Sequence, residues 1–295
     1  MPTDNERYPF WPLPDRPPIR WPNGARVAFW IIPNIEHFRF DKPNVDLAAS
    51  GPVPDVRNFG VRDYGNRVGI WRMMEVLDKH GLRATVALNS DVCNFYPQII
   101  RAGVERRWEW MGHGITNSQR ISGFEEDEER RIIQTVVDTI ASSTGQPPRG
   151  WLGPGLTETF RTPDLLAAAG ITYLCDWCVD EQPFPMRVQS GRLISVPYSL
   201  ELNDIPTLEG KGWSAEQFYQ AVCDQFDVLY ADGERNGRVM AVALHPYLSG
   251  HPHRAKWLDK ALAHITSHDR VWLTTGGEIA DWYYQHYYEQ AQHLL

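Results

Sequence analysis

Apolar runs and amphipathic stretches alternate along the chain from residue 25 onward. The stretch 25–32, "ARVAFWII", is continuously apolar, as expected of a strand that is covered on both faces of a sheet. Similar runs predict further strands at 84–89, 108–112, 171–177, 193–201, 238–245 and 270–275. Because these runs lack the alternation of half-exposed strands, they indicate a parallel sheet with helices on its outer side.

Amphipathic segments between these runs predict the helices. They lie at 68–81, 125–142 and 163–170, after Ser214, around 255–266 and from about 277. The segment 125–142 begins with acids, which the helix dipole favours, and Ser214 with Gln217 forms the S-x-x-Q pattern of a capping box. About seven strand–helix alternations in succession predict a distorted (β/α)7-type barrel.

The first 24 residues have a different composition. Seven prolines fall in residues 1–24, and each lacks the backbone donor that a helix interior or central strand needs. We therefore predict an extended N-terminal arm at 1–24 and one barrel domain at 25–295. Arms of this kind often wrap a neighbouring subunit, so we also predict a homo-oligomer.

Composition and charge exclude several classes of protein. With 42% hydrophobic and 12% aromatic residues, the 295-residue chain can build a large core. A net charge of −8 argues against a nucleic-acid partner, and no apolar run of about 18 residues indicates a membrane span. The opening lacks the basic start and apolar middle of a signal peptide, which predicts a cytoplasmic protein. Neither GxGxxG nor GxxxxGK[ST] occurs in a place that would indicate nucleotide binding.

Polar side chains follow the apolar runs, where barrels of this class carry their chemistry. Glycines on both sides of His113 bring backbone close and leave its imidazole open to a cavity. Two arginines, Arg67 and Arg149, could bind a carbonyl or carboxylate group, or form structural salt bridges. The residues at the strand ends are Asn34, Glu36, His37, His113, Asn117, Trp151, Asp176, Trp177, Glu201, Asn203, Asp204, His245 and Tyr247.

The order of these motifs resembles the polysaccharide deacetylases. It is most similar to the branch that hydrolyses small cyclic amides, which includes the analogous allantoinase and the bacterial cyclic imide hydrolases. The resemblance runs from about residue 20 to the end of the chain. It matches the Thr-Phe-Asp-Asp, His-x-x-x-His, arginine–glycine turn, Asp-Trp and Leu-His motifs of the family to 34–37, 113–117, 149–155, 176–177 and 244–245.

This resemblance implies roles for the matched residues. Glu36 would be the general base and His245 the general acid, while His113 would hold the developing oxyanion. The metal set of the family would become His37, His113 and Asn117, in which a neutral amide is a weak ligand for a divalent metal such as zinc. The resemblance therefore allows two alternatives, a site that holds a divalent metal such as zinc and a site that works without a metal. Without a metal, we expect the pocket to raise the pKa of Glu36.

The sequence thus predicts a hydrolase that opens a small cyclic imide or ureide by attack of water on a ring carbonyl. The residues expected to bind this small-molecule substrate are Trp151, Asp176, Trp177, Arg149 and Tyr247. Two alternatives remain open at this point. One is a carbohydrate N-deacetylase, and the other is a barrel that binds a small ligand without catalysis.

Overall fold

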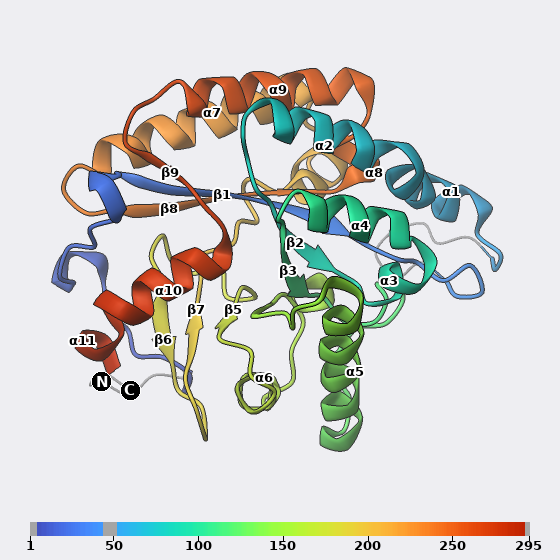
Figure 1. Ribbon diagram of the computed structural model, residues 1–295, viewed down its shortest axis with the longest axis horizontal. Coiled ribbons are helices and arrows are strands. Elements are labelled where there is room, and N and C mark those ends of the chain that lie inside the picture. Colours follow the sequence, from blue (N-terminus) through green and yellow to red (C-terminus); the bar gives the residue numbers. More distant parts are fainter. Residues whose placement is uncertain (1–4, 44–51, 293–295) are drawn as a thin grey trace.

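The computed structural model describes residues 5–43 and 52–292, so the first four residues of the predicted arm lie outside the described residues. The strands form one sheet in the order β6-β7-β5-β4-β3-β2-β1-β8, and β9 pairs with β1. Every pair is parallel except β6 with β7. In Figure 1 the sheet curls into a half-barrel with helices around its outside. The predicted (β/α) barrel is confirmed.

The strands lie at the predicted apolar runs, with two additions. Strands β4 and β6 are only two and three residues long, too short to give a periodic pattern. Strand β1 continues past residue 32 through Pro33 and Asn34, so Glu36 directly follows it. The strands are β1 (Val27–Ile35), β2 (Thr85–Leu88), β3 (Glu109–Gly112), β4 (Gly150–Trp151), β5 (Tyr173–Leu174), β6 (Phe184–Met186), β7 (Leu193–Ser195), β8 (Arg238–Leu244) and β9 (Val271–Leu273).

The helices include every predicted segment and several short ones that the pattern did not indicate. Ser214 and Gln217 form the predicted capping box at the start of α7. Two π-helical segments, η3 (Gly65–Gly69) and η5 (Ile205–Gly210), interrupt the regular elements. The α-helices are α1 (Val56–Tyr64), α2 (Ile70–Lys79), α3 (Asp91–Phe95), α4 (Pro97–Glu105), α5 (Glu126–Thr144), α6 (Thr162–Ala168), α7 (Ala215–Asp232), α8 (Pro246–Ser249), α9 (Pro252–Thr266), α10 (Gly276–His286) and α11 (Tyr288–Gln292).

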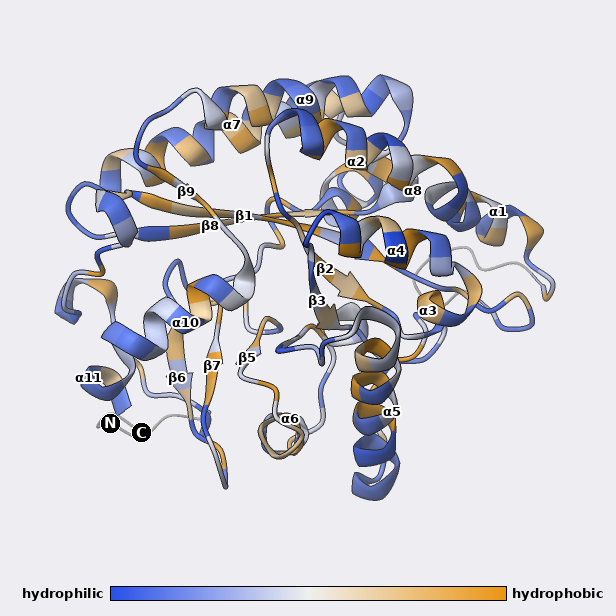
Figure 2. Cartoon of the chain, in the orientation of Figure 1, coloured by the Kyte–Doolittle hydropathy of each residue, from blue (hydrophilic) through white to orange (hydrophobic). Residues whose placement is uncertain are grey.

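Alternate side chains of the central strands pack into two apolar layers. Trp30 and Ile32 of β1 belong to the inner layer, while Phe29 and Ile31 belong to the layer between sheet and helices. In Figure 2 the strands carry much apolar colour, whereas the helices alternate between apolar and polar colour. Helix α10 closes one end of the barrel, where the Gly276 N–H donates to Thr85 Oγ1. The C-terminal strand ends lie at the opposite end.

Backbone hydrogen bonds connect the edge strand β8 to segments next to the strands β6 and β7 at the other edge of the sheet. The Val239 N–H of β8 donates to the Glu181 carbonyl, which lies just before β6, at 2.8 Å, and the Ala243 N–H donates to the Leu202 carbonyl at 2.9 Å. None of the described helices has the length and apolar character that crossing a membrane requires.

The described part of the arm packs against its own barrel. Arg7 pairs with Asp164 at 2.8 Å, and Arg16 pairs with Asp180 at 2.6 Å. Both pairs are largely shielded from solvent, so they fix the arm along α6 and the segment after β5. The homo-oligomer stays a prediction, and the arm in this position does not need a neighbouring subunit to be ordered.

Candidate active site

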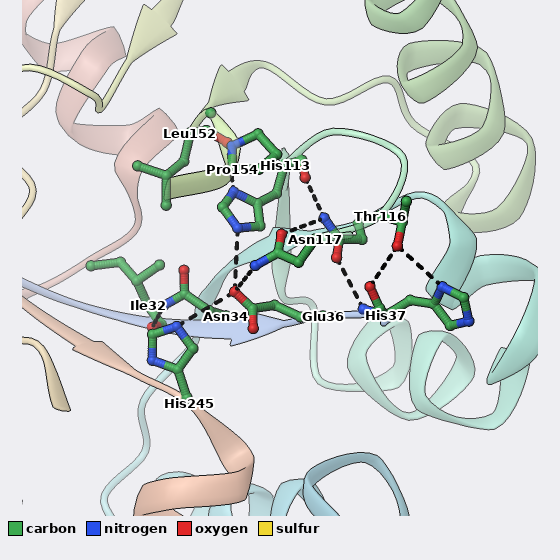
Figure 3. Close-up of polar contacts among 12 residues, drawn as sticks. Ile32, Asn34, Glu36, His37, His113, Thr116, Asn117, Leu152, Pro154 and His245 are labelled. Atoms are coloured by element: carbon green, nitrogen blue, oxygen red, sulfur yellow. Dashed lines mark hydrogen bonds and ion pairs between the residues drawn. The ribbon is translucent and has the colours of Figure 1, made fainter. Parts of the chain in front are cut away.

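Glu36, His113 and His245 meet at the C-terminal ends of three strands. They follow or end β1, β3 and β8, and all three side chains are buried. His113 Nε2 and His245 Nε2 each lie 3.5 Å from Glu36 Oε1. Figure 3 shows the two imidazoles on different sides of the carboxylate. The structure therefore brings together the three residues that the sequence predicts as catalytic.

A buried carboxylate orients His245. His245 Nδ1 lies 2.7 Å from Asp204 Oδ1, and the backbone N–H of His245 donates to Asp204 Oδ2 at 2.8 Å. The hydroxyl of Ser249 donates to the same Oδ2 at 2.6 Å. Because a carboxylate only accepts, Nδ1 carries a hydrogen, and Nε2 is left to face Glu36.

A backbone carbonyl orients His113 in the same way. Its Nδ1 lies 2.6 Å from the Leu152 carbonyl oxygen, so this nitrogen donates and Nε2 points to Glu36. Gly114 has a φ of +68°, and a Cβ at this position would lie 2.6 Å from Pro154 Cγ. The glycine after His113 is thus required by both backbone conformation and space, as the predicted close approach of backbone implies.

His37 is turned away from the carboxylate. Its ring stacks on Phe95 with a centroid distance of 4.4 Å, and its Nδ1 lies 3.5 Å from Asp91 Oδ2. Figure 3 shows the His37 ring on the side of Thr116, outside the group around Glu36. Successive residues of an extended segment point to opposite sides, so Glu36 faces the inside of the barrel and His37 faces outward.

Asn117 has both ends of its amide engaged. Its Nδ2 donates to Glu36 Oε1 at 2.5 Å, and its Oδ1 accepts from Asn89 Nδ2 at 3.1 Å. With His37 directed elsewhere, His113 is the one imidazole of the predicted ligand set that faces the carboxylate. The set His37, His113 and Asn117 does not converge as zinc ligands do, and its assignment as a metal site is wrong.

Elsewhere in residues 5–43 and 52–292, one group of side chains has ligand atoms close enough together to hold an ion. It consists of Asp227 of α7, His264 of α9 and His268, which follows α9. These residues lie on or just after the outer helices rather than at the strand ends, so they give no support to a metal beside Glu36.

The two imidazoles change the acidity of the carboxylate. Burial raises the pKa of Glu36, but the charge of His245 and hydrogen bonds from His113 and His245 outweigh burial and leave this pKa well below its ordinary value. The predicted rise is therefore wrong, because the sequence indicated burial but not two imidazoles around one oxygen. For His245, burial lowers the pKa while the Glu36 and Asp204 carboxylates raise it, to about 9.

Tyr247 lies at the site, whereas Trp151 does not. A cavity beside the carboxylate is lined by both Glu36 and Tyr247. Trp151 is fully buried in the outer apolar layer, where its ring packs against Gly112. The prediction of Trp151 as a substrate-binding residue is thus wrong. Successive side chains of a strand point to opposite faces of the sheet, and Trp151 points to the helices.

Asp176 and Trp177 form a polar group next to the arm. Asp176 Oδ1 accepts from the Gly153 N–H at 2.7 Å, and the Trp177 indole N–H donates to Glu158 Oε1 at 2.9 Å. Burial and the neighbouring Glu158 carboxyl raise the pKa of Asp176 well above its ordinary value. Trp177 and Glu158 line a cavity of about 1100 Å³ that also includes Arg7. Their role in binding substrate stays a prediction.

Arg149 lies at the far end of the barrel. It precedes β4, and its guanidinium forms an ion pair with Asp281 of α10. Both side chains are substantially exposed. The prediction of Arg149 as a substrate-binding residue is wrong, because a residue before a parallel strand lies at the N-terminal end of the sheet, opposite the catalytic rim.

The structure adds residues for which the sequence assigned no role. Asp204 appears in the sequence only as one of several polar residues after a strand, and Asn89 only as the last residue of another. In this stretch the sequence indicated Arg67 as a candidate and did not single out Arg62. Arg67 is 75% exposed in its side chain, whereas Arg62 is buried and lines the cavity beside Glu36.

Comparisons with known proteins agree with this fold. The family model for the polysaccharide deacetylases matches residues 62–174. A Schizosaccharomyces pombe relative that carries a polysaccharide deacetylase name is 28% identical over 91% of this chain and 94% of its own.

Solved structures extend the likeness to nearly the full chain. A Pseudomonas aeruginosa PAO1 protein, also named for the polysaccharide deacetylases, has a TM-score of 0.85 with 26% identity over 92% of this chain and 96% of its own. The PuuE allantoinase has a TM-score of 0.83 with 24% identity, over 92% and 95% of the two chains, and at that identity its likeness establishes the fold. The predicted distorted barrel of this kind is thus confirmed over residues far beyond the matched family segment.

Proposed function

Since the chain belongs to the polysaccharide deacetylase superfamily and is a hydrolase of carbon–nitrogen bonds, we propose that it opens a small cyclic imide or ureide. The observation that carries this proposal is the buried Glu36 carboxylate between two imidazoles that enter from opposite sides of the strand ends. An amide bond is hydrolysed by a base for the attacking water and an acid for the departing nitrogen, and this arrangement supplies both.

In the proposed reaction, Glu36 takes a proton from water as the water oxygen bonds to the ring carbonyl carbon. The electron pair of the C=O bond moves to the carbonyl oxygen, for which His113 would be the hydrogen-bond donor. On collapse the ring C–N bond breaks, and the nitrogen receives a proton from His245 Nε2. Proton transfer from Glu36 to His245, whose atoms lie 3.5 Å apart, then restores the starting state.

The closed shape of the site supports a small substrate. Glu36, His113 and His245 are each no more than 7% exposed. An extended polymer needs an open groove, whereas a compact ring can enter a pocket that closes over it. The name of the allantoinase among the structural neighbours is consistent with a ureide, a cyclic amide of this type.

A second candidate, removal of acetyl groups from N-acetylated sugars, is favoured by the names of the other relatives. The same base and acid would serve it, because an acetamide is cleaved by the same addition and collapse. The two candidates differ in substrate rather than in mechanism.

Assays on both substrate classes test the proposal. The purified protein is incubated with succinimide, hydantoin, dihydrouracil and allantoin, and ring opening is followed by chromatography; a parallel sample with acetylated glucosamine oligomers is assayed for acetate. We expect turnover of at least one ring, and E36Q to lower kcat by about 10²–10⁴-fold. E75Q, at an exposed position of α2, is the matched control and should retain activity.

Two outcomes contradict the proposal. Acetate release without ring opening would replace it with the deacetylase candidate. Equal turnover of a ring by E36Q and by the wild-type protein would remove Glu36 as the base.

A further inference from the structure

The small cavity beside Glu36 brings together three buried polar groups that lack partners. Glu36 Oε2, Arg62 Nε and Nη1, and Tyr247 Oη have no hydrogen-bond partner among the described residues. All three side chains line this cavity. A buried polar atom without a partner is costly, so three such groups around one space indicate that the space takes a polar occupant.

Arg62 is fixed in place by two aromatic rings. It is 4% exposed, and its Cζ lies 4.7 Å from the centroid of Phe38 and 4.0 Å from that of Tyr247. No ion pair of Arg62 is found within residues 5–43 and 52–292, so the acid that lines the same cavity, Glu36, is not in direct contact with it. A guanidinium held between rings keeps its charge and its planar set of donors in one orientation.

Glycines explain why these elements come so close. Helix α1 continues into η3, whose Gly65 and Gly69 face the backbone of α8. A Cβ on Gly65 would lie 2.7 Å from the Tyr247 nitrogen, and one on Gly69 would lie 2.0 Å from the Pro246 carbonyl oxygen. The two glycines therefore permit backbone-to-backbone packing that sets Arg62, one turn earlier, over the ring of Tyr247.

The size of the cavity identifies its occupant. Its volume of about 10 Å³ corresponds to about one water molecule and excludes a substrate ring. A water molecule there can accept from Arg62 and donate to Glu36 Oε2, while the Tyr247 hydroxyl can take either role. Glu36 Oε1 is already occupied by Asn117, which leaves Oε2 as the free oxygen of the base.

We propose that Arg62 and Tyr247 hold the attacking water against Glu36 Oε2, and that Arg62 stabilises the negative charge on this oxygen as it loses its proton. This inference rests on the proposed function and adds two catalytic residues to it. The depressed pKa of Glu36 fits, since a weak base needs an environment that stabilises the hydroxide-like oxygen. Among the residues that line this cavity, Arg62 is the one that carries a positive charge.

Variants of Arg62 test the role of its charge. R62M keeps much of the side-chain length but removes the charge, and we expect kcat to fall by about 10²–10³-fold with little change in KM. R62K keeps a charge and should lie between R62M and wild type, and Y247F should lower kcat less than R62M. R67M is the matched control, since Arg67 is 75% exposed in the same stretch, and it should leave kcat and KM unchanged.

Chemical rescue separates chemistry from a structural role. Added guanidine should restore part of the turnover of R62A, because the cation can re-enter the space left by the side chain, while it should not raise the turnover of R67M. Folding of each variant is checked by circular dichroism. If R62M and R62A do not fold, R62K and Y247F still report on the site.

A high-resolution crystal structure of the wild-type protein gives a readout that does not depend on turnover. We expect one ordered water within hydrogen-bond distance of Glu36 Oε2, Arg62 and Tyr247. An empty cavity, or a direct ion pair between Arg62 and Glu36, would overturn the inference, as would wild-type kcat in R62M. If the wild-type protein turns over none of the substrates, the proposed function fails by itself, and the presence of the water is still decided by the crystal structure.

Discussion

Removal of the charge on Asp204 should lower the pH above which the enzyme loses activity. Asp204 is fully buried and lies 2.7 Å from His245 Nδ1, and within the described residues that imidazole is the one cation that it contacts. In the proposed mechanism His245 must be protonated to act as the general acid. The alkaline limb of the profile of kcat/KM against pH therefore reports loss of its proton, near the pKa of about 9.

The size of the expected change follows from the two carboxylates around His245. Burial alone would lower its pKa, and Glu36 and Asp204 raise it from 6.5 to about 9, which corresponds to about 3 kcal/mol in favour of the protonated ring. Loss of one opposite charge at such a distance changes a pKa by about 1–3 units. In D204N the alkaline limb should accordingly move from about 9 to between about 6 and about 8.

The same substitution should change stability in a defined pH window. Because the folded pKa of His245 is raised, its contribution to stability is complete below the unfolded value of 6.5 and is lost as pH rises through about 9. In D204N this loss should begin at lower pH. Thermal unfolding of both proteins between these limits measures it.

Ser249→Ala is the control for this experiment. Its hydroxyl donates to Asp204 Oδ2, so the variant loosens the carboxylate without removing its charge. The alkaline limb of S249A should therefore stay close to that of the wild-type protein. An unchanged limb in D204N, or an equal movement in S249A, would show that the charge of Asp204 does not control the acid.

Two further predictions concern residues outside the catalytic group. R149A should leave kcat and KM unchanged and lower the free energy of unfolding by no more than about 1 kcal/mol, because its ion pair with Asp281 is exposed and lies at the opposite end of the barrel; kinetics and denaturant titration check this. Treatment with a chelator followed by dialysis should leave turnover unchanged, because His37 is turned away from Glu36 and both ends of the Asn117 amide are hydrogen-bonded; a loss that zinc restores would contradict this ligand geometry.

The sequence predicted the parts of the fold that depend on periodicity. Buried parallel strands require long apolar runs, so β1 and β8 were clear, and the acid-rich start of α5 identified that helix. Strands β4 and β6 were missed, since two or three residues carry no period. Strand β4 pairs with β3 and β5, which lie far from it in the chain, whereas β6 pairs with the next strand, β7.

For the site, the sequence could identify strand ends but not directions. Glu36, His113 and His245 were found because each directly follows or ends a strand that faces the rim. His37 and Trp151 were assigned wrongly because one position along an extended segment reverses the direction of a side chain. This direction depends on the exact end of β1, which lies three residues beyond the apolar run.

The electrostatics of the site bear on the choice between the two proposed substrates. Glu36 and His245 stabilise each other's charge, which makes the carboxylate a weaker base and the imidazolium, with a pKa of about 9, a weaker acid. Each pKa unit lost in this way corresponds to about 1.4 kcal/mol of driving force for proton transfer.

A weak acid and a weak base suit a substrate that is itself activated. In an imide or ureide the departing nitrogen shares its electrons with a second carbonyl, so it needs less help from His245 than the nitrogen of an acetylated amino sugar. The carbonyl carbon is also more electrophilic, which reduces the demand on Glu36. For a simple acetamide, the site would have to compensate through stronger stabilisation of the oxyanion. The mutual dependence of Glu36 and His245 therefore favours the cyclic imide or ureide over the N-acetyl sugar.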